Sequence, residues 1–189
     1  MSDLTTIVVD TNVLLNLSMP VVDRRDNAPC GADPLVAALS TYDVHVPASV
    51  IGELSTAANG GDLLASAATA VLRATHHLSS HEVHDAIDEP LEYGLDTGET
   101  HAIWLANDLS AAMFVTDEFN STNYLLISLA LDDRNILYTT PHLLCVLADH
   151  RVIPHEYVDH ALSYYVATKD WDQAYIEQLR AQYLTTDES

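Results

Sequence analysis

Four acidic side chains occupy positions where a parallel α/β protein gathers catalytic groups. Asp10 and Asp117 each follow an apolar, β-branched run, and Glu53 and Glu99 lie in or near the first turns of segments with helical patterning. Active sites of parallel sheets form at the carboxyl ends of the strands. Carboxylates that converge there repel one another unless a cation holds them together. Oxygen ligands of this kind suit Mg²⁺ or Mn²⁺, which can activate a water for phosphodiester hydrolysis.

A purely structural explanation competes with this one, because acidic residues are common at strand ends and helix N-caps. The chain has 28 acidic residues, so any one of these placements has roughly even odds of arising by chance. The local sequence around the four acids must therefore decide between the two explanations.

Four segments, in order along the chain, resemble the motifs of PIN-domain nucleases. They are IVVDTNVLL (7–15), VPASVIGEL (46–54), LDTGETHAI (95–103) and FVTDE (114–118). The third is similar to the D-x-G-E-x-x-A-I motif of one branch of that family. Together the segments cover the chain roughly from Thr6 to Asp149, and it is their combination that is specific.

The resemblance implies a PIN-like nuclease whose metal ligands and catalytic acids are Asp10, Glu53, Glu99 and Asp117. It also implies that Thr11 and Asn12 orient Asp10, a role that a hydroxyl and an amide can fill. The sequence departs from the family pattern at two of its acids. Many relatives carry aspartate at the position of Glu99, and several carry aspartate or arginine at the position of Glu118, so activity is less firmly implied than fold.

The activity implied is that of an endoribonuclease dependent on Mg²⁺ or Mn²⁺, with RNA as substrate. Resemblance to toxin-type relatives adds an antitoxin protein as a candidate partner and a homodimer as a candidate assembly. The alternative is a catalytically silent PIN-fold module that binds RNA or protein. A nuclease acting on DNA flaps ranks last, because the chain lacks the extra helical elements of such enzymes.

The charge is the most unusual global property of the chain. Seven basic residues oppose 28 acidic ones, which gives a formal net charge of −21, and Lys169 is the single lysine. Such a surface repels itself in dilute buffer but becomes tolerable at molar salt, where screening acts over about 3 Å. Acidity spread along the whole chain therefore resembles that of proteins from halophilic archaea. The alternative is an acidic protein that binds basic partners or calcium.

RNA affinity would have to come from metal ions and a few arginines, since the basic surface usual for such binding is missing.

The sequence also carries expectations about the compartment. It has no run of about 18 apolar residues that could cross a membrane, and its first residues lack the pattern of a signal peptide. Cys30 and Cys145 are far apart and form no CxxC motif. A reducing cytoplasm is therefore the expected location.

Short apolar strands alternate with helices along the chain, which predicts a three-layer α/β/α fold. The central sheet is expected to be mostly parallel with four to five strands, in a PIN-like domain over 1–150, and residues 151–189 are expected to form a helical extension packed on the same domain. Strands are predicted at 6–10, 44–46, 112–117 and 135–139. Helices are predicted at 13–17 (ended by Pro20), from Pro34, from Pro47, at 62–75, before Pro90, at 102–107, from Pro141, and twice after Pro154.

Other residues with chemical potential receive structural interpretations. His77, His81 and His84 fall at spacings that could line one helical face, but zinc binding there has odds of about one in ten and a solvated helix end is the preferred interpretation. Asp96 is interpreted as a helix cap. The exposed pair Arg24 and Arg25 could contact a phosphate or a partner, although such pairs usually have no special role.

Overall fold

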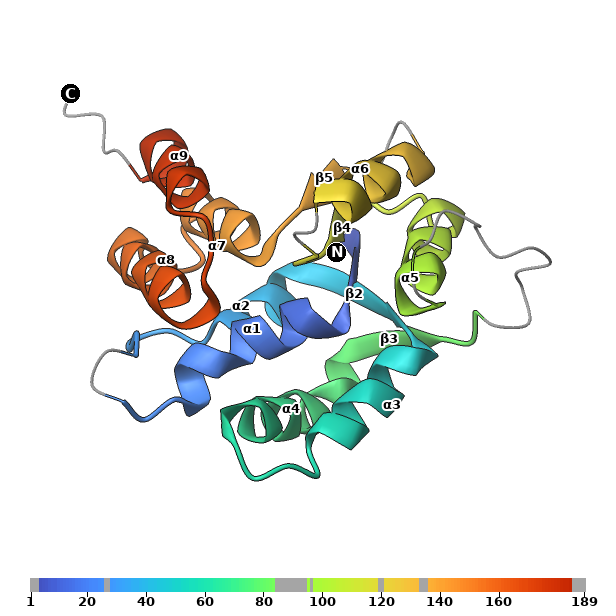
Figure 1. Ribbon diagram of the computed structural model, residues 1–189, viewed down its shortest axis with the longest axis horizontal. Coiled ribbons are helices and arrows are strands. Elements are labelled where there is room, and N and C mark those ends of the chain that lie inside the picture. The colour runs from blue at the N-terminus through green and yellow to red at the C-terminus, as the bar shows by residue number, and fades with distance from the viewer. Residues whose placement is uncertain are drawn as a thin grey trace.

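The computed structural model describes residues 4–25, 28–83, 95, 97–118, 121–132 and 136–184. They form an α/β protein with a five-stranded sheet in the order β3-β2-β1-β4-β5, in which every neighbouring pair is parallel (Figure 1). The strands are β1 (Thr5–Val9), β2 (Tyr42–Pro47), β3 (Leu78–His81), β4 (Met113–Val115) and β5 (Ile136–Tyr138).

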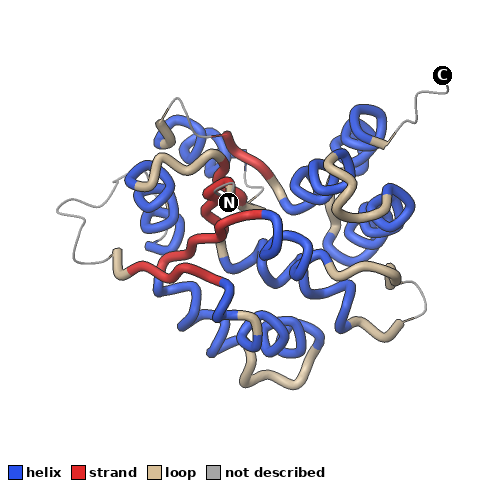
Figure 2. Tube along the Cα trace, turned by 180° about the vertical axis from the view of Figure 1, so that it is seen from behind, coloured by secondary structure: helices blue, strands red, loops and turns tan. Residues whose placement is uncertain are grey.

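Helices cover both faces of this sheet, which confirms the predicted three-layer α/β/α architecture (Figure 2). One layer contains α1 (Thr11–Val22), α2 (Pro34–Thr41), α3 (Ala48–Ala57), α4 (Leu63–Arg73), α7 (Thr140–Asp149), α8 (His155–Lys169) and α9 (Gln173–Tyr183). The other contains α5 (Thr97–Asp108) and α6 (Ser121–Ala130). In β1, Ile7 and Val9 face the first layer and Val8 faces the second. Strands buried on both faces are continuously apolar, which explains the unbroken apolar runs Ile7–Val9 in β1 and Met113–Val115 in β4.

Local capping chemistry starts several helices where the sequence predicts. The carboxylate of Asp33 accepts a hydrogen bond of 3.0 Å from the backbone N–H of Val36, and Pro34 occupies the first turn of α2. Thr139 caps α7 in the same way, ahead of Pro141. An acceptor at the N-cap satisfies a backbone donor that has no partner within the helix, so these boundaries depend on short-range sequence alone.

The prediction that the first helix ends before Pro20 is wrong, because α1 continues to Val22 with Pro20 inside it. Proline has no N–H, so the carbonyl of Asn16 loses its usual helical donor. The hydroxyl of Tyr165, from α8, donates to that carbonyl at 2.7 Å. A remote side chain thus compensates for the missing backbone hydrogen bond, and the helix survives.

The histidine segment is not the helix end that the sequence favours. Thr75–His77 form a 3₁₀ turn, and Leu78–His81 form edge strand β3, which pairs with β2. Only one residue of that strand is apolar, so pairing with β2 rather than local pattern determines its structure. His84 and the helix expected before Pro90 lie outside the described residues. Helix α6 (Ser121–Ala130) is present in the structure but is not among the helices that the sequence predicts.

Helices α8 and α9 share the main hydrophobic core with the sheet. Val158, Leu162 and Tyr165 of α8, and Ile176 and Leu179 of α9, are buried in the same cluster as the inner residues of β1 and β2. Residues 155–183 therefore contribute directly to the core that supports the strands.

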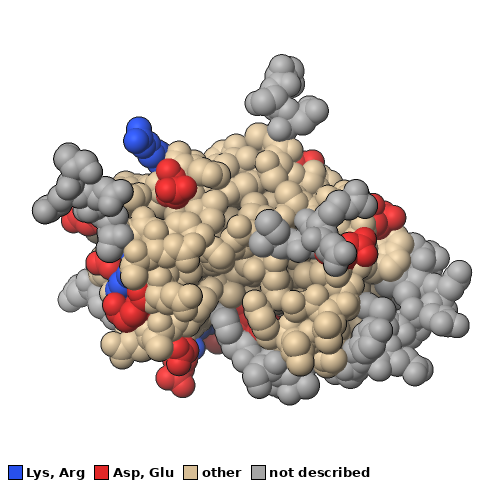
Figure 3. All heavy atoms as spheres, turned by 90° about the horizontal axis from the view of Figure 1, so that it is seen from above, with Lys and Arg blue, Asp and Glu red and all other residues tan. Residues whose placement is uncertain are grey.

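Charge is dispersed on the face seen from above, where acidic residues are scattered and basic ones are isolated (Figure 3). Among the described helices, none is both long enough and apolar enough to cross a membrane.

Replacing Tyr165 with phenylalanine should destabilise the protein by about 1–3 kcal/mol, because the buried Asn16 carbonyl would lose its donor. Urea denaturation would measure this loss. Tyr157→Phe, on the same helix, is the matched control, since the buried Tyr157 hydroxyl has no hydrogen-bond partner among the described residues. Equal effects of the two substitutions would contradict the assigned role of Tyr165.

Candidate functional site

A small pocket at the carboxyl end of β1 brings acidic side chains together from four separate segments. Asp10 immediately follows β1, Glu53 lies on α3, Glu99 lies in the first turn of α5, and Glu118 follows β4. All four line one cavity of about 80 Å³, together with Thr11, Asn12, Val50, Gly98 and Ala102. Three of the four acids singled out in the sequence therefore meet here. The fourth, Asp117, does not line the cavity.

Asp10 is held at the centre of this arrangement by hydrogen bonds to both carboxylate oxygens. Its Oδ1 accepts from the backbone N–H of Val13 at 2.8 Å, so Asp10 is also the N-cap of α1. Its Oδ2 accepts from the hydroxyl of Thr116 and, at 3.4 Å, from the backbone N–H of Asp117. Burial, and then the charge of Asp117, raise the pKa of Asp10 to about 7.

Asp117 lies beside Asp10 but directs its carboxylate to other partners. Its Oδ2 accepts from the amide of Asn16 at 2.7 Å and from the hydroxyl of Thr140, and its Oδ1 accepts from the backbone N–H of Thr140 at 2.7 Å. Burial raises the pKa of Asp117, while the hydrogen bonds from Thr140 and Asn16 oppose that rise. A carboxylate offers about four acceptor sites, so these three bonds leave about one for a metal ion or a water.

Thr11 holds Glu53 in this structure, since its hydroxyl donates to Glu53 Oε2. Asn12 is exposed and lines the pocket. The hydroxyl that orients Asp10 belongs instead to Thr116. The motifs thus contain the residues of the pocket, but only the structure shows that Thr11 binds Glu53 and that Thr116 binds Asp10.

Sequence reasoning missed several residues that shape the site. Glu118 lines the pocket, although it was noted only as a departure from the family pattern. Thr116, inside the last motif, could have been selected as a hydroxyl next to Asp117. The local sequence around Asn16 and Thr140 does not indicate that they bind Asp117, because they lie far from it in the chain, on α1 and at the start of α7.

The donor set suits a hard divalent cation held largely through water. Within the described residues, no three histidine, cysteine or acidic side chains are already grouped tightly enough to hold a metal directly. Mg²⁺, however, commonly keeps several waters and uses one or two carboxylates, and the pocket has room for a few waters. Burial, and then the negative charge of Asp117, raise the pKa of Asp10, and a bound cation would favour the ionised carboxylate against both effects.

The other candidate residues have partners elsewhere in the fold. Arg25 forms an ion pair with the buried carboxylate of Asp23, and Arg24 is exposed. His81 Nε2 lies 2.7 Å from His45 Nδ1 on the neighbouring strand. Asp96, expected to cap α5, lies outside the described residues.

Asp10→Asn should stabilise the metal-free protein at pH 8 and have little effect near pH 4. The folded chain keeps the Asp10 proton up to about pH 7, whereas the unfolded chain releases it near its ordinary pKa of about 4. The folded state therefore binds more protons between these values, and its stability falls as pH rises through that range. Asparagine removes this cost, which is on the order of 4 kcal/mol for a pKa raised from 3.8 to about 7, while it retains a capping oxygen.

Thermal unfolding in EDTA at the two pH values would measure this difference. Asp62→Asn is the matched control, because Asp62 caps α4 in the same manner, away from the pocket. A gain that is the same at both pH values would contradict the charge penalty assigned to Asp10.

Comparison with known proteins supplies no family assignment. No protein-family model matches the sequence, and no curated protein matches it. A function for this chain must therefore be inferred from the geometry of the acidic pocket and from the four motifs that contain its residues.

Proposed function

We propose that this protein is a PIN-like endoribonuclease that uses Mg²⁺ or Mn²⁺ to hydrolyse phosphodiester bonds in RNA. The observation that carries the proposal is the pocket in which Asp10, Glu53, Glu99 and Glu118 converge at the carboxyl end of a parallel strand. Asp117 lies outside the cavity and acts on Asp10, to which its backbone N–H donates a hydrogen bond and whose pKa its charge raises. Carboxylates that converge in one cavity repel one another, and a bound cation would offset that repulsion.

In this mechanism Asp10 would be the principal metal ligand, and Glu53, Glu99 and Glu118 would hold the ion directly or through its waters. The bound metal would lower the pKa of a water and stabilise the leaving oxygen. The hydrogen bonds from Val13 and Thr116 fix the direction of the Asp10 carboxylate. Glu53, exposed at the rim and positioned by Thr11, can accept the proton released by the attacking water.

Several further features of the proposal come from the family resemblance and from composition. RNA as substrate, an antitoxin partner and a homodimer follow from the likeness of the motifs to toxin-type PIN nucleases. A salt-rich cytoplasm as the compartment follows from the net charge of −21 and from the two cysteines, which are both free thiols.

A catalytically silent module that binds RNA or protein is the second candidate. One observation favours it: Asn16 and Thr140 occupy most of the Asp117 carboxylate. The two candidates differ in metal affinity, because an intact acidic pocket should bind Mn²⁺ and a degraded one should not.

Asp10→Asn should lower Mn²⁺ affinity at least about tenfold and reduce metal-dependent cleavage of single-stranded RNA at least about 100-fold, because the central ligand is lost. Calorimetric titration with Mn²⁺ and gel analysis of a 5′-labelled RNA would measure the two effects. Asp62→Asn should behave as the wild type. Undiminished cleavage by Asp10→Asn, or cleavage that persists in EDTA, would refute the proposal.

Mn²⁺ affinity should rise with pH and level off above about pH 7. The metal must displace the proton that Asp10 retains up to that pH, so the apparent affinity should gain up to about tenfold per pH unit below it. Titrations between pH 5.5 and 8.5 would measure the dependence. A flat profile would show that Asp10 is not the group deprotonated on binding.

A further inference from the structure

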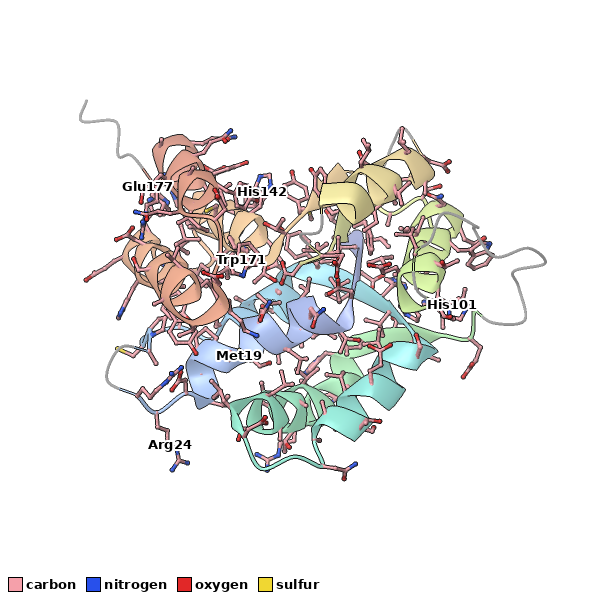
Figure 4. The ribbon with its side chains drawn as sticks, viewed as in Figure 1. Met19, Arg24, His101, His142, Trp171 and Glu177 are labelled. Carbon is pink, nitrogen blue, oxygen red and sulfur yellow. The ribbon has the colours of Figure 1, made fainter. Side chains whose placement is uncertain are left out.

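A second and larger cavity lies at the same edge of the sheet as the acidic pocket. It has a volume of about 700 Å³ and opens between the end of β5, helix α6 and the loop that joins α8 to α9. Aromatic rings dominate its lining, with Tyr124 from α6, Trp171 from the loop and Tyr175 from α9. Figure 4 shows His142 on α7 and Trp171 on the same side of the molecule. Cavities of this size accommodate small organic ligands.

The two cavities are neighbours because of the strand order. The acidic pocket lies at the end of β1 and the aromatic cavity at the end of β5, with β4 between them. Adjacent strands are about 4.8 Å apart, so the ends of β1 and β5 are separated by about 10 Å within the sheet. A short series of contacts connects them: Thr139 lines the aromatic cavity, Thr140 binds Asp117, and Asp117 donates to Asp10.

The aromatic lining is held in place by defined contacts. Trp171 and Tyr175 are stacked with ring centroids 6.3 Å apart and planes inclined by 25°. The Tyr175 hydroxyl lies 2.7 Å from the hydroxyl of Thr139, at the end of β5. Tyr124, 45% exposed, lies at the mouth. Preformed aromatic surfaces of this kind bind unpaired bases by stacking, with little dependence on base identity.

Lys169, the single lysine of this strongly acidic chain, also lines the aromatic cavity. Its side chain is partly buried at the end of α8, and within the described part of the chain its ammonium forms no hydrogen bond or ion pair. Burial lowers the pKa of Lys169, and the negative charge of Asp117 opposes that fall. Of the two aspartates in the lining, Asp172 is engaged as the N-cap of α9 and Asp170 is exposed.

We propose that this cavity binds an unpaired nucleobase of the substrate RNA, stacked against its aromatic side chains, with an adjoining phosphate at Lys169. This inference rests on the proposed function, because the RNA strand would then continue along this edge of the sheet to the acidic pocket. A base adds no negative charge to an acidic protein, and Lys169, which lines the cavity, supplies a positive charge for the adjoining phosphate. Duplex RNA is excluded, since its bases are stacked and paired.

Tryptophan fluorescence provides a direct test in EDTA, where no cleavage occurs. Trp104→Phe leaves Trp171 as the only indole, since the chain has two tryptophans. A single-stranded oligoadenylate RNA of about six nucleotides should quench this emission. An abasic strand of equal length and a blunt duplex RNA should not.

Two substitutions test the lining. Tyr124→Ala should weaken oligoadenylate binding at least about fivefold, corresponding to the lower end of base stacking on an aromatic side chain, whereas Leu125→Ala should not. Leu125 is the matched control because it is exposed on the same helix and does not line the cavity. Lys169→Gln should weaken binding about fivefold and reduce its salt dependence by about one ion, and Lys169→Arg should restore both.

The outcomes separate this inference from the proposed function. Absence of quenching, or equal quenching by the abasic strand, would overturn the base site and leave an apolar small molecule or a protein side chain as the occupant. If the protein cleaves RNA but Tyr124→Ala and Lys169→Gln bind oligoadenylate as tightly as the wild type, the base site would be overturned and the nuclease proposal would stand. Quenching that both variants weaken, in a protein that never cleaves RNA, would support the base site and reject the nuclease.

Discussion

The juxtaposition of two partly buried carboxylates, Asp10 and Asp117, is the constraint on which the rest of the site depends. Parallel pairing of β1 and β4 forces their strand ends together, so the two negative charges must be accommodated rather than separated. Hydrogen bonds from Thr116 to Asp10, and from Asn16 and Thr140 to Asp117, offset part of the repulsion. The charge that remains uncompensated is what would attract a cation to this edge of the sheet under the proposed function.

Support for those carboxylates reaches far beyond the strands. Asn16 uses its side chain to bind Asp117 and its backbone carbonyl to accept the hydroxyl of Tyr165. Thr140 binds the same aspartate from the start of α7, directly after Thr139, which contacts Tyr175 of α9. The C-terminal helices are therefore part of the framework that orients the acids, in addition to their contribution to the core.

Local sequence predicts the parts of this protein that depend on short-range chemistry. The apolar runs of β1 and β4 and the Asp33–Pro34 helix start could be predicted because burial on both faces and N-capping leave direct marks on composition. Strand β3 and the passage of α1 through Pro20 could not, since both depend on partners distant in sequence. The same distinction applies to the site: the motifs locate Asp10 and Glu53, but only the fold reveals that the carboxylate of Asp117 is largely occupied.

Proline inside α1 has a consequence for how order is lost in this molecule. Its missing N–H makes the first helix depend on a hydroxyl contributed by Tyr165, roughly 150 residues later in the chain. Detachment of α8 would expose the Asn16 carbonyl and loosen the helix that begins at Asp10. The unfolding of α1 is thus coupled to that of α8. Slow amide exchange in α1 should therefore depend on how firmly α8 is packed against it.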